Sequence, residues 1–323
     1  MMRLPAIGES LLELVSPYLE SIAPHMPGEV FPSFFTLTLL QRALIAAVLV
    51  TVVSAFLGCF LLIRNLALIG DGLAHVSFGG IAVGLVVGST SPLEYALLFA
   101  VIASLLIHEL QSREILTGDA SIAIFSTGML ALGLVVLRLE ITFSLPLIGT
   151  IELTQVGITN TVEGYLYGNL YTLRSEDLDL ITWICLFSFA ALFVLRHGLL
   201  AIAVDPLAAK IQGIPVRGIG LFFSILIAAV VTAMVKIIGA LLVTALLVTP
   251  AATAQLLGRS YRECILYSQL IGLISVILGI YLSAELDTGG GSMIALVAAC
   301  IFGIIAMTQI IVKSILNRNQ NLN

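Results

Sequence analysis

The feature that most constrains the fold is a series of long apolar runs, which recurs from residue 36 to residue 312. Inside a bilayer the backbone must satisfy its own hydrogen bonds, so a run of about 20 apolar residues crosses as a helix. Charged residues make up only 10% of the chain, whereas soluble domains carry about 25%. The sequence therefore predicts an all-α, polytopic membrane protein, located in the cell membrane.

The runs predict eight or nine transmembrane helices. The expected spans are 36–63, 66–89, 92–109, 120–137, 178–196, 219–235, 237–257, 263–284 and 292–312. The weakly apolar segment 138–177 is long for a loop, and we expect a short or re-entrant helix over about 151–172. Residues 36–315 then form the transmembrane domain, and residues 316–323 form a tail.

The N-terminal segment 1–35 is expected to stay outside the bilayer core. It contains five prolines and several acidic residues, and it lacks the apolar core of a signal peptide. Its apolar residues have the spacing of an amphipathic helix that lies at the membrane interface. These residues are Leu11, Leu12, Leu14, Val15 and Leu19.

The basic residues of the loops set the orientation, because Lys and Arg are enriched on the cytoplasmic side. Lys210 and Arg217 place the 198–218 loop in the cytoplasm. Counting spans forward from that loop places the C-terminus in the cytoplasm as well. The side on which the N-terminus lies depends on whether the 151–172 segment re-enters the membrane.

Two ionisable residues, Asp71 and His75, stand in the otherwise apolar stretch 64–88. They are four apart, so a helix places them on the same face. An ionisable residue inside a span costs on the order of 2.5–3.5 kcal/mol, so a compensating role is expected. We interpret the pair as ligands for a transported metal ion; a helix–helix hydrogen bond or a proton relay would also use these residue types.

Two ligands are too few for an ion such as zinc, which takes three or four. Since the other spans carry no obvious matching His or Cys, we expect the missing ligands to be Asp71 and His75 of a second copy across a two-fold axis. Small residues on the same helix, Gly79, Gly80 and Gly84, would let the two copies approach closely.

Two other features need an interpretation. The 198–218 loop has a helix start at Asp205–Pro206 and a stop at Gly213, so it is either an ordinary loop or a docking element for a soluble partner. Lys236 lies between two apolar runs. It either extends its amine to the outer surface or serves as a counter-charge.

Several catalytic motifs are absent or incomplete. The chain has no GxxxxGK[ST] sequence, so any ATP hydrolysis requires another subunit. The His108–Glu109 pair begins a zinc-protease motif, but Ser112 stands where its second histidine belongs. Leu68 likewise breaks the GxGD pattern of intramembrane aspartyl proteases. An intramembrane protease is therefore disfavoured.

Four stretches together resemble the permease subunits of ABC-type importers for zinc, manganese and iron(II). The resemblance covers about residues 36–312. It is carried by R-x-x-A-L-I-G-D-G-L-A-H at 64–75, YLYGNLYTLRSEDL at 165–178, VDPLAAKIQGIPV at 204–216 and KIIGALLVTALLVTPAATAQLL at 236–257. It implies the type II ABC importer permease fold, with Asp71 and His75 lining the metal path and an ATPase-coupling segment in which Asp205, Ala209 and Gly213 hold the characteristic positions.

The same resemblance implies a transport subunit that is not itself an enzyme. Its expected partners are a second copy of itself, a cytoplasmic ATP-binding subunit, an extracytoplasmic metal-binding protein and the lipid bilayer, with no nucleic acid. No permanently bound cofactor is expected. The cargo would be a divalent metal ion, Zn²⁺ most favoured, with Mn²⁺ or iron(II) as alternatives. A secondary metal carrier coupled to another ion, without an ATPase, is the alternative function.

Overall fold

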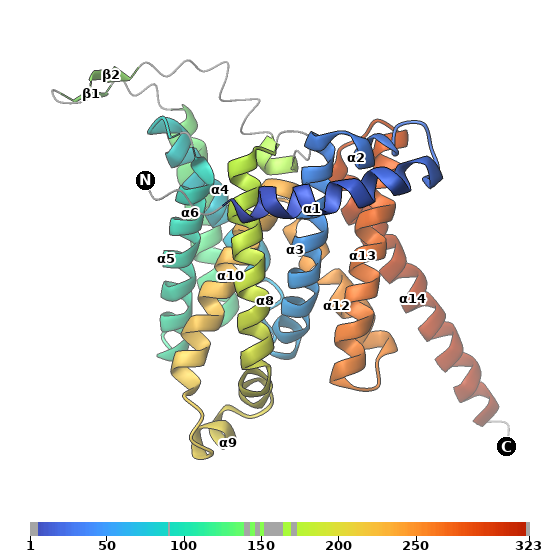
Figure 1. Cartoon of the computed structure of the whole chain (residues 1–323). Coiled ribbons are helices and arrows are strands. Elements are labelled where there is room, and N and C mark those ends of the chain that lie inside the picture. Colours follow the sequence, from blue (N-terminus) through green and yellow to red (C-terminus); the bar gives the residue numbers. More distant parts are fainter. Residues whose placement is uncertain are drawn as a thin grey trace.

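The computed structural model describes residues 6–89, 91–138, 143–145, 149–151, 164–168 and 173–320. Within them, eight helices are long and apolar enough to cross a bilayer. They run between the two ends of a bundle, from which the C-terminal part of α14 slants away (Figure 1). These helices are α3 (Thr38–Ile63), α4 (Ile69–Val86), α5 (Pro92–Ser112), α6 (Gly118–Arg138), α8 (Ser175–Val204), α10 (Val216–Ile238), α13 (Tyr261–Glu285) and α14 (Gly290–Gln320). The predicted multi-pass helical fold is confirmed.

The expected span 237–257 is wrong as a continuous helix. The chain breaks at Gly239 and continues as two short helices, α11 (Val243–Leu247) and α12 (Thr249–Leu257). Gly239 has φ +94°, a conformation that glycine adopts readily and a helix does not. Pro250 then stands in the first turn of α12, where its missing N–H has no helical partner to lose. The two short helices connect the upper end of α10 with the lower start of α13 (Figure 1).

The N-terminal segment lies across the end of the bundle that we call the upper end, opposite α9 (Pro206–Ile211) at the lower end (Figure 1). It forms α1 (Ile7–Ile22), the 3₁₀ turn η1 (Ala23–His25) and α2 (Ser33–Thr36). Asp179 of α8 holds α1, because its Oδ1 accepts hydrogen bonds from the N–H groups of Gly8 (2.7 Å) and Glu9 (3.2 Å). That α1 lies at the membrane interface stays a prediction.

The segment between α6 and α8 contains a small hairpin, in which β1 (Phe143–Leu145) pairs antiparallel with β2 (Gly149–Ile151) and Leu145 faces Gly149. Residues 164–167 form a helical turn. The expected re-entrant helix over 151–172 otherwise falls on 152–163 and 169–172, which lie outside the described residues.

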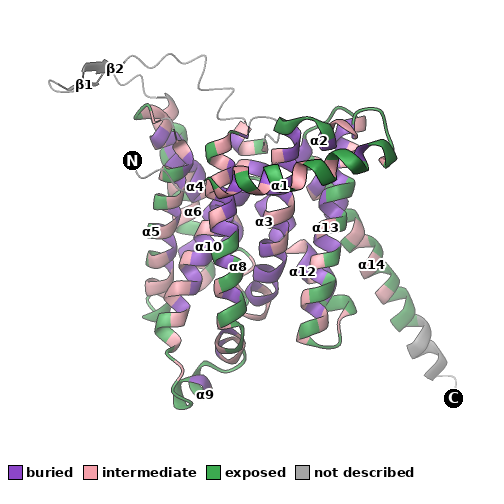
Figure 2. Ribbon diagram, in the orientation of Figure 1, coloured by how far each residue is buried: buried purple, intermediate pink, exposed green. Residues whose placement is uncertain are grey.

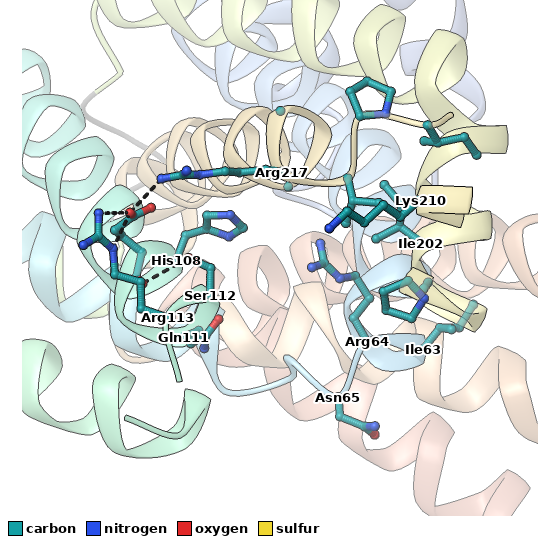
Figure 3. A pocket seen from close by; sticks show the side chains of 18 residues that line it. Ile63, Arg64, Asn65, His108, Gln111, Ser112, Arg113, Ile202, Lys210 and Arg217 are labelled. Carbon is teal, nitrogen blue, oxygen red and sulfur yellow. Dashed lines mark hydrogen bonds and ion pairs between the residues drawn. The ribbon is translucent and has the colours of Figure 1, made fainter. Parts of the chain in front are cut away.

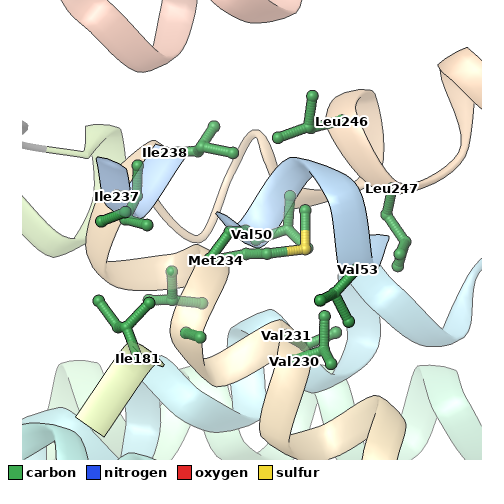
Figure 4. Packing of buried hydrophobic residues seen from close by; sticks show 14 of the residues in the cluster. Val50, Val53, Ile181, Val230, Val231, Met234, Ile237, Ile238, Leu246 and Leu247 are labelled. Atoms are coloured by element: carbon green, nitrogen blue, oxygen red, sulfur yellow. The ribbon is translucent and has the colours of Figure 1, made fainter. Parts of the chain in front are cut away.

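The centre of the bundle consists of α3, α4 and α10, most of whose residues are buried, whereas α6 and α14 are mostly open (Figure 2). Apolar side chains from distant parts of the sequence meet here, among them Val50 of α3, Met234 of α10 and Leu247 of α11 (Figure 4). Because lipid is as apolar as these side chains, close packing rather than the exclusion of water holds such helices together.

The glycines of α4 have a different use from the one expected. A Cβ added to Gly79 would lie 2.6 Å from the carbonyl oxygen of Met129 in α6, and one added to Gly80 would lie 2.7 Å from that of Tyr95 in α5. Gly84 likewise faces Pro92 and Tyr95. These glycines let α4 pack against α5 and α6 of its own chain, so the idea that they admit a second copy is wrong.

Candidate functional site

Asp71 and His75 lie on the first two turns of α4, on the same face, as their spacing predicts. The Nε2 atom of His75 is 3.7 Å from Oδ2 of Asp71. The His75 side chain is 14% exposed and that of Asp71 is 45% exposed. Leu68, one turn before Asp71, is also exposed, so Leu68 and Asp71 form an open edge at the start of a mostly buried helix, and the partly buried His75 lies next to it.

The pair lies near the middle of the bundle. Ser77 of α4 and Thr232 of α10 share a hydrogen bond of 3.2 Å between their hydroxyl groups, which sets the relative height of the two helices. Thr232 is six residues from the upper end of α10, and Asp71 is six residues before Ser77. At 1.5 Å per residue, Asp71 lies about 18 Å below the upper end of α10, roughly half the length of that helix.

The donor set is one carboxylate and one imidazole. The second ring nitrogen of His75, Nδ1, is buried and has no hydrogen-bond partner among the described residues. Within that part of the chain, no group of three or more His, Cys, Asp or Glu residues could hold a metal ion. Carboxylate oxygen and imidazole nitrogen suit first-row divalent ions. One chain therefore offers two ligands that could bind such an ion from an open face.

The predicted coupling segment forms a short helix, α9, beyond the lower end of the bundle (Figure 1). Asp205 caps it, since its Oδ1 accepts hydrogen bonds from the N–H groups of Leu207 (2.9 Å) and Ala208 (3.0 Å). Ala209 is buried on the inner side of the helix. Gly213 ends the segment with φ +80°, which a residue with a Cβ rarely adopts.

The outer side of α9 is apolar and open. Leu207 is 74% exposed and Ile211 is 87% exposed. Each of the three positions that the resemblance assigns to coupling thus has a structural role. Asp205 caps the start of α9, Ala209 packs against the rest of the chain, and Gly213 lets the chain turn after the helix. None of the three presents the exposed apolar surface, which sequence reasoning had not singled out.

Lys236 is a counter-charge and does not extend to the surface. Its Nζ lies 3.2 Å from Oδ2 of Asp177 on α8, and the two side chains are only 10% and 16% exposed. The same Nζ donates to the hydroxyl of Tyr165 at 3.3 Å. The backbone next to Tyr165 also pairs with the break after α10, because Ala240 N–H donates to the Tyr165 carbonyl (2.9 Å). Two of the stretches singled out in the sequence, 165–178 and 236–257, therefore meet.

A family model described as the ABC 3 transport family matches residues 36–309. Among curated proteins, the manganese transport system membrane protein MntC of Halalkalibacterium halodurans is 31% identical over 274 residues, which cover 85% of this chain and 88% of that protein. The high-affinity zinc uptake system membrane protein ZnuB of Haemophilus influenzae is 27% identical, with 82% and 95% covered.

Two solved structures have similar folds. PsaBC of Streptococcus pneumoniae, solved in complex with a Fab, superposes with a TM-score of 0.70 and 27% identity, over 83% of this chain and 90% of that one. An inward-facing metal-chelate type ABC transporter gives a TM-score of 0.69 at 19% identity, over 94% and 99% of the two chains. The second likeness concerns the fold alone.

Proposed function

We propose that two copies of this chain form an importer for Mn²⁺ or Zn²⁺, because the chain belongs to the ABC 3 transport family and is a permease subunit of the manganese and zinc group of ABC transporters. The observation that carries the proposal is the Asp71–His75 pair, which lies at mid-depth and has no further His, Cys, Asp or Glu grouped with it in the part of the chain that the structure describes. A second pair across a two-fold axis brings the ligand number to four, as such ions require.

The same geometry supports a passage site rather than a storage site. The carboxylate must be ionised and the imidazole neutral to bind the ion. Two carboxylates at an apolar seam repel one another, and a divalent ion between them relieves that repulsion. Without thiolate ligands the site holds its ion less tightly than a structural zinc centre, so the ion can leave toward the other side.

The ATP-binding partner is proposed to dock on α9. The exposed side chains of Leu207 and Ile211 are an apolar surface of the kind that a partner covers, and the cap at Asp205 keeps the helix in shape while force passes through it. Movement of α9 would shift α8 and α10, the two helices that it joins, and so open one end of the bundle while closing the other.

The lower end is proposed to face the cytoplasm. The α5–α6 turn, α9 and the α12–α13 turn all lie at this end (Figure 1) and carry the basic residues Arg113, Lys210 and Arg259. This bias follows the positive-inside rule. The C-terminal end of α14 then lies in the cytoplasm, and the upper end, with α1, faces a metal-delivering protein outside.

Uptake of ⁵⁴Mn²⁺ or ⁶⁵Zn²⁺ into vesicles tests the function, with the permease reconstituted together with its ATPase and its metal-binding protein. Asp71→Asn and His75→Ala should each abolish most ATP-dependent uptake. The matched controls Asp119→Asn and His197→Ala change exposed residues elsewhere and should transport normally. Normal uptake by both site variants would refute the site, and uptake that needs no ATP would favour a secondary carrier.

A further inference from the structure

A large cavity lies at the lower end of the bundle, away from the Asp71–His75 pair. Its volume is about 1030 Å³, and its walls come from the ends of α3, α5 and α8, from α9 and from the start of α10 (Figure 3). Aliphatic side chains such as Ile63 and Ile202 line part of it. The remaining lining is polar and mostly basic, and the four basic side chains are Arg64, Arg113, Lys210 and Arg217.

The one carboxylate that lines this cavity is already paired. Glu109 is the only acidic residue among the described residues that line it, and its Oε1 lies 2.7 Å from Arg113 and 2.8 Å from Arg217. Arg64 and Lys210, by contrast, have no carboxylate within 4 Å in the part of the chain that the structure describes. Two positive charges thus line one cavity without an anionic partner.

Arg64 is the more constrained of these two cations. Its guanidinium lies over the ring of Phe223, 5.3 Å from the centroid, and burial lowers the pKa of the Arg64 side chain. Lys210 reaches the cavity from α9, and Figure 3 shows the two side chains extending toward the same space. Burying a cation without a counter-ion is costly, so an anion bound beside Arg64 would offset that cost, and the exposed Lys210 offers the anion a second positive charge.

Further groups at the cavity lack partners. Nε2 of His108 and the amide nitrogen Nε2 of Gln111 are buried and have no hydrogen-bond partner among the described residues. The Gln111 amide nitrogen can only donate. The Gln111 nitrogen lies against Gly118, so the donors left for a ligand are the Arg64 guanidinium and the Lys210 ammonium. These groups fit a ligand with several acceptor oxygens, because charge-assisted bonds to phosphate are the strong ones for such donors.

We propose that this cavity binds a phosphate-bearing anion, with Arg64 and Lys210 as its principal ligands. The cavity lies where α3 and α5, two helices long and apolar enough to cross a bilayer, end, and basic pockets of this kind between helices receive anionic headgroups. Its aliphatic wall and its volume suit a phospholipid headgroup with its glycerol; free phosphate offers the same oxygens. The binding does not depend on the proposed transport function.

The test uses the purified full-length permease in phosphatidylcholine nanodiscs, titrated with fluorescent phosphatidylglycerol. Saturable binding is expected. Arg64→Gln and Lys210→Gln should each weaken it about fivefold, the effect of one basic residue near a lipid surface. Lys210 is exposed on α9, so its variant does not disturb the packed core even if Arg64→Gln folds poorly. Arg262→Gln, a basic residue at the same end that does not line the cavity, should bind like the wild type.

Competition with inorganic phosphate distinguishes the two sources. Displacement of the lipid at millimolar phosphate supports a site that accepts free phosphate, and failure to displace it supports a site that needs the glycerol and acyl parts. The proposal is overturned if the permease shows no saturable binding of phosphatidylglycerol, or if Lys210→Gln binds as well as Arg262→Gln. If the permease shows no saturable binding of phosphatidylglycerol, an acidic side chain of a partner protein becomes the expected occupant of the cavity.

Discussion

Replacement of Lys236 by Met should destabilise the upper end of the bundle. Met has a similar length but no charge, so the change removes the ion pair with Asp177 (3.2 Å) and the hydrogen bond to Tyr165 (3.3 Å) while it fills most of the same volume. The Asp177 carboxylate then stays largely buried, and the partner that remains among the described residues is the N–H of Arg174 at 3.2 Å.

The expected loss is about 3 kcal/mol in the free energy of unfolding. Removing one member of a buried pair costs about 3–5 kcal/mol, because it leaves the other charge uncompensated; the hydrogen bond from Arg174 places this case at the lower end. The change also removes a cation–π contact between Nζ and the Tyr165 ring, whose centroid lies 4.8 Å away. This contact accounts for about 0.5–1 kcal/mol of the expected loss. In the double variant Lys236→Met/Asp177→Asn no buried charge remains, so about 2 kcal/mol should be recovered relative to the sum of the single variants.

Unfolding in SDS, followed by the fluorescence of Trp183 on α8, measures these differences; Trp183 is the only tryptophan of the chain. Lys313→Met, which changes an exposed lysine of α14, is the control and should leave the unfolding free energy unchanged. If Lys236→Met unfolds like the wild type, or if the two single effects add in the double variant, the ion pair does not stabilise the fold and the reasoning fails.

Three further predictions concern single positions. Gly239→Ala should lower the melting temperature and the folded yield, because the residue has φ +94° and a Cβ would collide with the backbone of Gly168. The control Gly303→Ala should be neutral, because nothing lies within 4 Å of a Cβ added there. Equal folded yields for the two variants would contradict this prediction. Asp205→Ala should destabilise the start of α9 by about 1 kcal/mol and lower the ATPase rate of the assembled complex. Asp205→Asn keeps a hydrogen-bond acceptor and should retain the wild-type rate. A normal ATPase rate in Asp205→Ala would argue against coupling through α9. Asp179→Ala should release α1 from α8 and speed proteolysis within residues 1–35, since two hydrogen bonds to a charged acceptor are lost. The control Glu13→Ala, at an exposed position of α1, should leave the rate of proteolysis unchanged. Equal cleavage of the two variants would show that Asp179 does not hold α1 in place.

The sequence predicted most of the architecture, because a bilayer permits few ways to satisfy a backbone. Eight of the expected spans correspond to long helices, and the spacing of Asp71 and His75 predicted that they share a face. The break at Gly239 escaped prediction because its cause is remote: Gly168, 71 residues earlier, approaches the same backbone. Composition cannot show which apolar run will be broken by such a contact.

The charge pairing was also beyond sequence reasoning. Lys236 finds its partner on α8, and the two basic residues of the lower cavity, Arg64 and Lys210, come from segments about 150 residues apart in the chain. The glycines of α4 were recognised as sites of close approach, but only the packed structure assigns their neighbours, which are α5 and α6 of the same chain. Local patterns thus predicted helices and faces, whereas partners across the bundle needed the fold.

The most direct test of the account is the number of metal ions that bind per chain. Equilibrium dialysis of the purified permease against Mn²⁺ or Zn²⁺, with the oligomeric state measured in the same buffer, gives that number. We expect a dimer that binds one ion for every two chains, and no binding at that site in Asp71→Asn or His75→Ala. A monomeric permease that binds one ion for each chain, or binding that both variants leave unchanged, would contradict it.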